Sequence, residues 1–329
     1  MFEENFDVIV VGSATRDVLM ATKGFELRKN GNSPTGVEQC FPLGTKIEIG
    51  EIFFVTGGGG TNAAATFGRQ GVKTACIGVV GRDTVGQEIM TELVREKVNV
   101  DYFQIHDDDY TAYSVILVGP KGERTILSYK GEGQHFEVGE IPFAKLKTKW
   151  FFLDSLGGRF EILEEVVKRA EKIGAKIAMN PGGRELAHGL EKLEPILKRI
   201  DIFICNQEEG ARLVGVEYSD GERILEVLKE YVKGLIVITD GQRGVKLLAP
   251  GGVRYYAGVP SSPIVERTGA GDAFGSGFVV EYMRSGLIEK AIKFATANAS
   301  SVVTKYGGKA GILGRGDWGP WPLVEVVKK

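Results

Sequence analysis

Short apolar runs alternate with amphipathic helical stretches along most of the chain, and this alternation limits the folds that it can adopt. The apolar runs end in glycine or a polar residue, as buried strands of a parallel sheet do. Phe160–Ile173 repeats apolar residues with the period of a helix, and Gly174 follows it as a stop signal. The predicted strands are Asp7–Gly12, Lys73–Gly81, Lys176–Met179, Ile200–Asn206 and Leu235–Thr239. Repeated strand–helix–strand units predict a three-layer α/β/α fold with a mostly parallel central sheet.

Two stretches depart from this alternation. Leu19–Thr56 has no convincing helix, and Tyr110–Lys130 has the pattern of a hairpin around the turn sequence GPKGE. We expect these stretches, about 19–56 and 110–130, to form a small β-sheet lid on a single domain over residues 1–329. No low-complexity linker or internal repeat divides the chain.

Charge and composition exclude several classes of protein. The formal net charge is −2, so nothing global favours binding to nucleic acid or anionic lipid. No apolar run approaches the ~20 residues of a membrane helix, and the first residues lack the features of a secretory signal. We therefore expect a cytoplasmic protein with no nucleic-acid or membrane partner. The histidines His106, His135 and His188 lack metal-ligand spacing and are predicted as surface or loop residues.

Glycine accounts for 46 of the 329 residues, about twice the ordinary ~7%, and the later of its two main clusters is Arg267–Phe278, RTGAGDAFGSGF. Small residues at 269–271 let backbone amides converge at the start of a helix, where a phosphate or a developing oxyanion binds well. Asp272 lies in the first turn of that helix, where it can take a proton from an attacking hydroxyl. The alternative is an acidic residue favoured only by the helix dipole.

The earlier cluster is Gly57–Gly71, GGGGTNAAATFGRQG. Its glycines allow a ligand to approach the backbone closely, and Asn62 offers both a hydrogen-bond donor and an acceptor. A flexible turn with an asparagine helix cap is the alternative. Four consecutive glycines cost conformational entropy that a plain turn does not require, so we favour a binding loop.

These clusters resemble the two signatures of the ribokinase-like carbohydrate kinases, the phosphofructokinase B type. Gly57–Asn62 resembles the first signature and Arg267–Phe274 the second, and the likeness runs from Val8 to about Ile312. The resemblance implies a ribokinase-like fold. It also implies magnesium-dependent transfer of the γ-phosphoryl group of ATP to an alcohol group of a sugar, a sugar phosphate or a nucleoside.

The resemblance further implies roles for individual residues. For catalysis it implies Asp272 as general base and the amides of Gly269, Ala270, Gly271 and Asp272 as an anion hole. For the acceptor it implies Asp17, Gly58, Gly59 and Asn62. For the nucleotide it implies Asn206, Thr239, Gly241, Gly244, Asn298 and Gly308. Glu209 is implied to organise Mg²⁺ through water, because oxygen ligands suit that largely hydrated ion. Alone, the sequence NQEE at 206–209 would indicate a helix cap with a first-turn acid.

The chain departs from the family pattern at Glu266 and Arg267, which replace an aspartate and a threonine. In potassium-activated members these positions help to bind a monovalent cation. Thr268 is retained, so the resemblance implies a K⁺ site that includes Thr268. Arg267 either stabilises the transferred phosphate or pairs with Glu266. The stretch from Asp17 to Gly57 is longer than in typical ribokinases and is expected to enlarge the lid.

Three functions fit these residues: a sugar kinase, a nucleoside kinase of the same family, and a catalytically silent regulator that binds sugar or nucleotide. The joint presence of Asp272, Asn206 and Glu209 argues against the regulator. A dinucleotide oxidoreductase is disfavoured because no G-x-G-x-x-G pattern follows the first strand. Lid aromatic residues such as Phe53 either stack on a base or simply pack. We also expect a homodimer through the lid, because exposed strands tend to pair unless they are covered.

Overall fold

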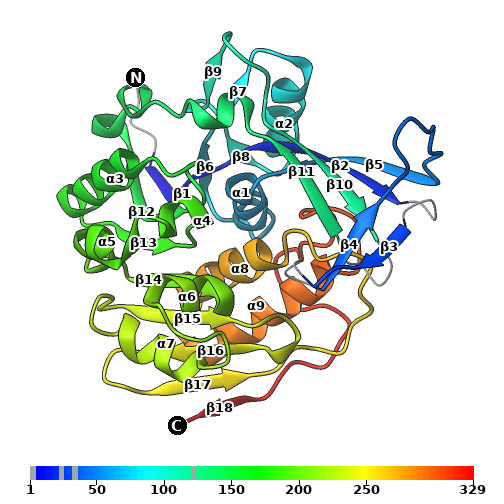
Figure 1. The fold of residues 1–329 in the computed structure, drawn as a ribbon. Helices are drawn as coiled ribbons and strands as arrows, with labels where there is room; N and C mark the ends of the chain where they lie inside the picture. Colours follow the sequence, from blue (N-terminus) through cyan, green and yellow to red (C-terminus); the bar gives the residue numbers. More distant parts are fainter. Residues whose placement is uncertain (1–4, 22–25, 32–35, 120–123) are drawn as a thin grey trace.

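A ten-stranded sheet runs through the centre of the part of the chain that the structure describes (Figure 1). The structure is a computed structural model that describes residues 5–21, 26–31, 36–119 and 124–329. Its strands in spatial order are β18 (Val326–Lys328), β17 (Arg254–Ala257), β16 (Val245–Leu248), β15 (Leu235–Thr239), β14 (Ile202–Asn206), β13 (Lys176–Met179), β12 (Lys147–Leu153), β1 (Asn5–Val11), β6 (Thr74–Ile77) and β8 (Val98–Asn99). The strands from β8 to β15 are parallel, and β16, β17 and β18 are antiparallel additions at one edge. The mostly parallel sheet is confirmed.

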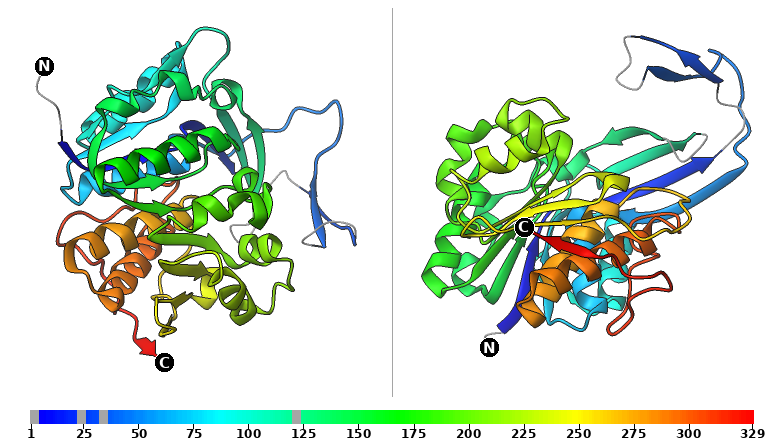
Figure 2. Two further views of the ribbon diagram at one scale, coloured as in Figure 1. Left: turned by 90° about the vertical axis from the view of Figure 1, so that its left-hand side faces the viewer. Right: turned by 90° about the horizontal axis from the view of Figure 1, so that it is seen from below.

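Helices cover both faces of this sheet and give the three predicted layers (Figure 2). On one face lie α1 (Gly59–Arg69), α2 (Thr84–Arg95), α8 (Ala270–Ser285) and α9 (Ile288–Val302). On the other lie α3 (Phe160–Ile173), α4 (Gly183–Leu186), α5 (Gly189–Leu197), α6 (Gln207–Val214) and α7 (Gly221–Leu228). Alternation along β1 explains the two cores, because Ile9 and Val11 enter one and Val8 and Val10 enter the other. In the described residues, no helix combines the length and apolar character needed to span a bilayer.

A small separate sheet forms a lid beside the carboxyl end of β1. Its strands in spatial order are β11 (Arg124–Tyr129), β10 (Tyr113–Val118), β2 (Thr15–Ala21) and β5 (Glu51–Gly57). The strands of the predicted hairpin are confirmed by β10 and β11, whereas its turn at 120–123 lies outside the described residues. A further hairpin of β3 (Glu26–Lys29) and β4 (Val37–Cys40) projects beyond the lid, as expected from the long insertion (Figure 2).

Two strand boundaries differ from those expected. The lid begins at Thr15 rather than at about 19, because Arg16 and Asp17 are buried and pair with β5 and β10 as part of the strand instead of forming a turn. The predicted strand Lys73–Gly81 is divided at Gly78 into β6 and β7 (Val79–Gly81), and β7 pairs with β9 (Gln104–His106) in a sheet of its own. A side chain at Gly78 would come within 2.9 Å of the Phe103 ring, so glycine allows the close approach there.

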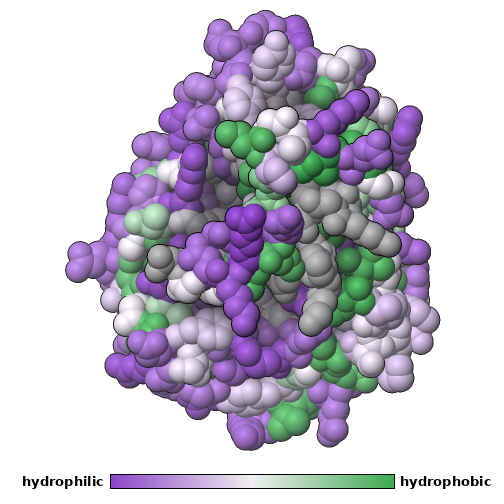
Figure 3. Space-filling view, turned by 45° about the vertical axis from the view of Figure 1, so that its right-hand side comes forward, coloured by the Kyte–Doolittle hydropathy of each residue, from purple (hydrophilic) through white to green (hydrophobic). Residues whose placement is uncertain are grey.

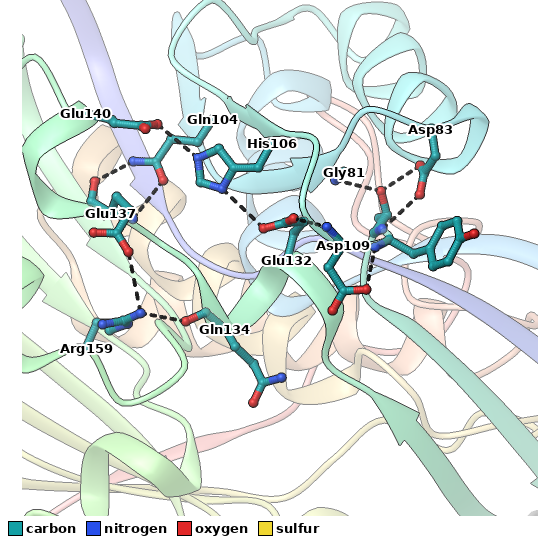
Figure 4. A network of polar contacts seen from close by, with 12 residues as sticks. Gly81, Asp83, Gln104, His106, Asp109, Glu132, Gln134, Glu137, Glu140 and Arg159 are labelled. Atoms are coloured by element: carbon teal, nitrogen blue, oxygen red, sulfur yellow. Dashed lines mark hydrogen bonds and ion pairs between the residues drawn. The ribbon is translucent and has the colours of Figure 1, made fainter.

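The base of the lid hairpin is held by polar contacts around His106 (Figure 4). His106 Nδ1 lies 3.2 Å from Glu132 of η2 (Gly131–Gln134), and its Nε2 lies 3.0 Å from Glu140 of η3 (Val138–Glu140). Burial opposes protonation, but the hydrogen bonds with Glu140 and Glu132 prevail and raise the pKa of His106. Glu132 in turn accepts a hydrogen bond from the amide of Asp109, and the carboxylate of Asp109 accepts one from the hydroxyl of Tyr129 at the end of β11. His106 was predicted as a surface or loop residue, but it lies in β9 with its side chain 15% exposed, and its ring joins β9 to η2 and η3.

Candidate active site

Polar residues gather where parallel strands end, at the carboxyl edge of the large sheet. Of the predicted site residues, Asn206 ends β14 and Thr239 ends β15, and Ser13 and Asp154, which were not predicted, follow β1 and β12. Ligands of open parallel sheets bind at this edge. The lid sheet begins at the same place, because β2 follows β1 directly and β5 leads into α1.

The glycine run at the start of α1 makes room for two buried carboxylates. A Cβ at Gly57 would overlap the carboxylate of Asp17, and one at Gly59 would overlap that of Asp154. Asp17 is 5% exposed and Asp154 is 4% exposed. Gly58 has a φ of 93°, and a Cβ there would lie 2.5 Å from the Ser13 carbonyl oxygen. Side chains at Gly57, Gly58 or Gly59 would clash with their neighbours, which explains the run of glycines. The carboxylates of Asp17 and Asp154 both lie against the backbone of this run.

The second glycine cluster forms the first turn of α8. Gly269 is the N-cap with a φ of 76°, a left-handed conformation that favours glycine, and Asp272 is the third residue of the helix. The amides of Gly271 and Asp272 have no preceding helical turn to supply an acceptor, whereas the Ala270 amide donates to the Arg267 carbonyl at 3.3 Å. This arrangement offers an anion site at a helix N-terminus.

One hydrogen bond joins the two clusters. Asn62 Nδ2 of α1 donates to Asp272 Oδ2 of α8 at 2.8 Å, across 210 residues of sequence. Asn62 Oδ1 is buried and has no hydrogen-bond partner in the described structure. A Cβ at Gly308 would lie 2.5 Å from Asn62 Nδ2, and one at Gly269 would overlap the Cα of Gly308. The loop around Gly308 thus packs against the anion site and Asn62 together.

The electrostatics of these acids differ from those of exposed carboxylates. Burial raises the pKa of Asp272, although the hydrogen bond from Asn62 opposes the shift. Burial also raises the pKa of Asp17, and it raises that of Asp154 well above the ordinary value with help from the charge of Asp272. A carboxylate with a raised pKa is a stronger proton acceptor. Several carboxylates with raised pKa values in one cluster are typical of functional sites.

The predicted nucleotide residues on β14 and β15 lie side by side. Asn206 pairs with Thr239 in the register of the sheet. Asn206 caps α6 by accepting the Glu209 amide at 2.8 Å, and Glu209 accepts the Asn206 amide at 3.0 Å. This capping box is the structural alternative that the sequence left open. Gly241 opens η5 (Gly241–Arg243), and Gly244 ends it with a φ of 95°, so both glycines shape the turn after Thr239.

Asn298 does not have the accessible position that a residue beside the adenine would need. Its side chain is fully buried, its Nδ2 donates to the Ala273 carbonyl at 2.8 Å, and its Oδ1 accepts the Leu313 amide at 2.9 Å. Asn298 therefore braces α8 against the last loop, and we leave it out of the nucleotide site proposed below.

Glu266 and Thr268 lie together ahead of the anion site. Glu266 Oε1 accepts the Thr268 amide at 2.6 Å and the Thr268 hydroxyl, and it lies 4.0 Å from Arg124 Nε of the lid. Glu266 Oε2 is buried with no hydrogen-bond partner among the described residues. Arg267 is exposed and forms no ion pair with Glu266, so the pairing that the sequence allowed is not found in this part of the chain.

Two residues of this region escaped the sequence analysis. Asp154 is a single acid after an apolar strand, and only its position at the carboxyl end of β12 could have marked it. Lys309 is 4% exposed and donates from Nζ to the carbonyl and hydroxyl oxygens of Thr56, each at 2.9 Å. A lysine in a glycine-rich loop carries no sequence signal of burial. No cluster of three or more metal-binding side chains occurs in the residues that the structure describes.

Comparisons with known proteins agree with this geometry. The pfkB family carbohydrate kinase description matches residues 6–313. The chain is 28% identical to the ribokinase of Haemophilus influenzae over 261 residues, which cover 78% of this chain and 83% of that protein. The solved ribokinase of Arabidopsis thaliana, complexed with ribose and ATP, has a TM-score of 0.75 at 22% identity and 94% and 96% coverage. A nucleoside kinase of Burkholderia thailandensis in complex with inosine has the same TM-score at 16% identity and the same coverage.

The family match includes both glycine clusters, the carboxyl edge of the sheet and the lid strands, which is nearly all of the described chain. Because the family description covers these parts of the fold and the site, this chain belongs to the pfkB family of carbohydrate kinases.

Proposed function

We propose that this kinase transfers the γ-phosphoryl group of ATP to a hydroxyl of a sugar or sugar derivative, with Asp272 as the general base. The observation that carries the proposal is the position of Asp272 in the first turn of α8, where Asn62 holds its carboxylate beside the free amides of the anion site. In this proposal the Asp272 carboxylate faces the proton of the attacking hydroxyl, and the N-terminus of α8, which carries Asp272, faces the transferring phosphoryl group. Phosphoryl transfer depends mainly on such positioning and electrostatic stabilisation.

The acceptor is proposed to lie between the lid and the glycine run, against Asp17 and Asp154. Carboxylates accept hydrogen bonds from hydroxyl groups, and these two flank a backbone without side chains. A polyhydroxylated substrate fits such a pair of acceptors better than a flat base does. The lid ring of Phe53 stacks on Tyr306 at 4.1 Å between centroids, so it packs within the protein rather than presenting an open face. These features favour a sugar over a nucleoside.

The nucleotide is proposed to lie over Thr239, the turn from Gly241 to Gly244, and Gly308, with its transferring phosphoryl group at the unpaired amides of Gly271 and Asp272. Asn206 and Glu209 fit a hydrated magnesium ion, since they offer amide and carboxylate oxygens at the same strand end. When bound with the nucleotide, that ion neutralises phosphate charge. The chain's own residues position the donor, and the lid excludes water from the reacting groups.

A monovalent cation is proposed to bind at Glu266 and Thr268, where the unpartnered Oε2 of Glu266 offers a buried negative oxygen. KCl is then expected to raise the melting temperature relative to the same concentration of choline chloride, because ligand binding to the native state stabilises it. Glu266→Gln removes the charge and is expected to abolish this difference, as measured by differential scanning fluorimetry.

Glu281→Gln is the matched control. Glu281 is also buried with one oxygen that accepts no hydrogen bond, but its charge is already balanced by ion pairs with Arg284 and Lys290. A potassium response that survives Glu266→Gln would rule out this cation site.

We further propose that two copies associate through the lid face that points away from the site. Phe54 of β5 is 61% exposed and Leu127 of β11 is 54% exposed. The register places Phe54 beside Val18 of β2 and Leu127 beside Val115 of β10, and Val18 and Val115 pair with each other, so all four lie on the same face. Apolar residues gather on the side of the molecule that carries the lid (Figure 3). Exposed apolar sheet faces of this kind are typical of interfaces.

The lid and the main sheet are proposed to act as one kinase domain in each copy.

Phe54→Glu is expected to convert the dimer to a monomer, because a desolvated charge without a partner would lie at the centre of the interface. Light scattering after size exclusion measures the mass. Leu287→Glu, at a 60% exposed apolar position before α9, is the control and should leave the mass unchanged. A monomeric wild-type protein, or a Phe54→Glu dimer, would contradict the proposed interface.

The experiment that tests the proposed function measures ATP consumption with magnesium against separate panels of pentoses, hexoses, sugar phosphates and nucleosides. Turnover with a sugar or sugar phosphate, and none with nucleosides, is the expected result. Turnover with nucleosides alone would favour the second candidate, a nucleoside kinase, which similarity to nucleoside kinases supports. ATP binding by calorimetry without turnover on any panel would favour a silent regulator and contradict both kinase functions.

A further inference from the structure

Lys309 places an ammonium group in the interior beneath the proposed site. Its side chain is 4% exposed and bonds only Thr56, through the carbonyl and hydroxyl oxygens at 2.9 Å each, among the residues that the structure describes. Taking an ammonium group out of water is costly unless negative charge or hydrogen bonds compensate. The compensation must therefore come from the groups that surround it.

Acidic groups on three separate elements favour the charged form of Lys309: Glu92 on α2, Asp17 on β2 and Asp272 on α8. Two of them adjoin its hydrogen-bond partner Thr56, because the Thr56 hydroxyl donates to Glu92 and the Asp17 carboxylate lies against the next residue, Gly57. Burial nevertheless dominates and lowers the pKa of Lys309 to about 8. The lysine in turn lowers the pKa of Asp17 and of Asp272 against the effect of burial. The two acids assigned to the acceptor and to catalysis thus share one buried cation.

Other charged groups near Lys309 already have partners of their own. Arg69 of α1 donates to the Lys309 carbonyl at 2.6 Å and pairs with Glu96. Arg16 forms an ion pair with Glu88, and both residues line a cavity of about 700 Å³ that Thr56 and Lys309 also line.

The contacts of Lys309 also connect the lid with the loop under the anion site. Thr56, its hydrogen-bond partner, is the residue of lid strand β5 immediately before the glycine run. Gly308, the residue before it, packs on Asn62 and Gly269. A single side chain therefore ties the lid to the loop under the anion site.

We propose that Lys309 is a positioning residue of this kinase, whose buried positive charge offsets the negative charge of Asp17 and Asp272 while its hydrogen bonds fix lid strand β5 to the loop under the anion site. This inference rests on the proposed function for its effect on turnover. Its electrostatic part concerns only the described groups and holds or fails independently of any substrate. A purely structural tie to Thr56 is the competing explanation.

The first part of the test is an NMR titration that does not require a working kinase assay. In protein labelled with ¹³C at lysine Cε, one resonance should titrate near pH 8 and vanish in Lys309→Met, while the other lysines titrate higher. In Asp17→Asn and in Asp272→Asn that resonance should titrate at lower pH, because each substitution removes a negative neighbour. Glu289→Gln, in the first turn of α9, should leave it unchanged. An ordinary lysine titration, or no shift in either aspartate variant, would overturn the inference.

The second arm uses the pH profile of kcat/KM with the acceptor found by the panels. Lys309→Met should move the acid limb to higher pH by about one unit, because Asp17 and Asp272 lose their cation, and should remove an alkaline limb near pH 8. Lys305→Met, at an exposed lysine of the same loop, is the control. A uniform loss of rate with an unchanged profile would show a structural tie only. If no acceptor is turned over, the proposed function fails and the labelling arm alone decides on Lys309.

Discussion

Asp272→Asn is expected to lower kcat by about 10²–10⁴-fold, the usual cost of losing a general base. Asparagine keeps the size of the side chain and can still meet Asn62, but it cannot accept the proton of the attacking hydroxyl. The melting temperature should change little, because the carboxylate is destabilised by burial in the native state. The measurement is steady-state turnover of ATP and acceptor beside a thermal melt of the same preparation.

The competing explanation for Asp272 is a helix acid that interacts only with the dipole of α8. Such an acid contributes about 0.3–1 kcal/mol to stability and nothing to turnover. Glu289→Gln provides the matched control, since Glu289 lies in the first turn of the adjacent α9, away from the proposed site. If Asp272→Asn lowered the melting temperature as Glu289→Gln does and left kcat near the wild-type value, Asp272 would not be the base.

Gly269→Ala is expected to reduce kcat by about 10²–10³-fold, as does the loss of one donor from an oxyanion hole. The new Cβ would overlap the Cα of Gly308, so the two loops must separate and the amides of the first turn of α8 must move. The left-handed φ of 76° adds about 1–2 kcal/mol of strain for any residue with a Cβ.

Gly286→Ala separates the effect of strain from that of displacement. Gly286 caps the other end of α8 with a φ of 68°, and a Cβ there meets nothing within 4 Å. Both variants should lose stability in urea unfolding through the left-handed φ, and Gly269→Ala should lose more because its Cβ also meets Gly308, whereas only Gly269→Ala should lose turnover. Equal turnover in the two variants would mean that the position of the first-turn amides does not matter for the reaction.

The parts of the fold that follow from local pattern were predictable. Periodicity located α3, and Gly174 ends it in the left-handed conformation as expected. The strands β13 and β15 lie where the apolar runs predicted them, at Lys176–Met179 and Leu235–Thr239. Both glycine clusters stand at helix starts, because small residues before an apolar helical pattern mark such starts whatever the tertiary structure.

Contacts between residues that are far apart in the sequence were not predictable from one sequence. The carboxylate of Asp154 rests on Gly59, and Lys309 bonds Thr56 across 253 residues, so neither contact leaves a local signal. Asparagine is a residue type that often binds ligands, but both the Nδ2 and the Oδ1 of Asn298 are hydrogen-bonded within the protein, to Ala273 of α8 and to Leu313 of the last loop.

The most direct test of the central claim follows the phosphoryl group itself. Wild-type protein and Asp272→Asn would each be mixed with magnesium, the acceptor found by the panels, and ATP radiolabelled in its γ-phosphoryl group, and the acceptor would then be separated and counted. The account predicts label on the acceptor with the wild-type protein and a loss of at least a hundredfold in its rate of appearance with Asp272→Asn, within the about 10²–10⁴-fold range for a general base. Label that reaches the acceptor equally fast with both proteins, or that appears only in inorganic phosphate, would contradict it.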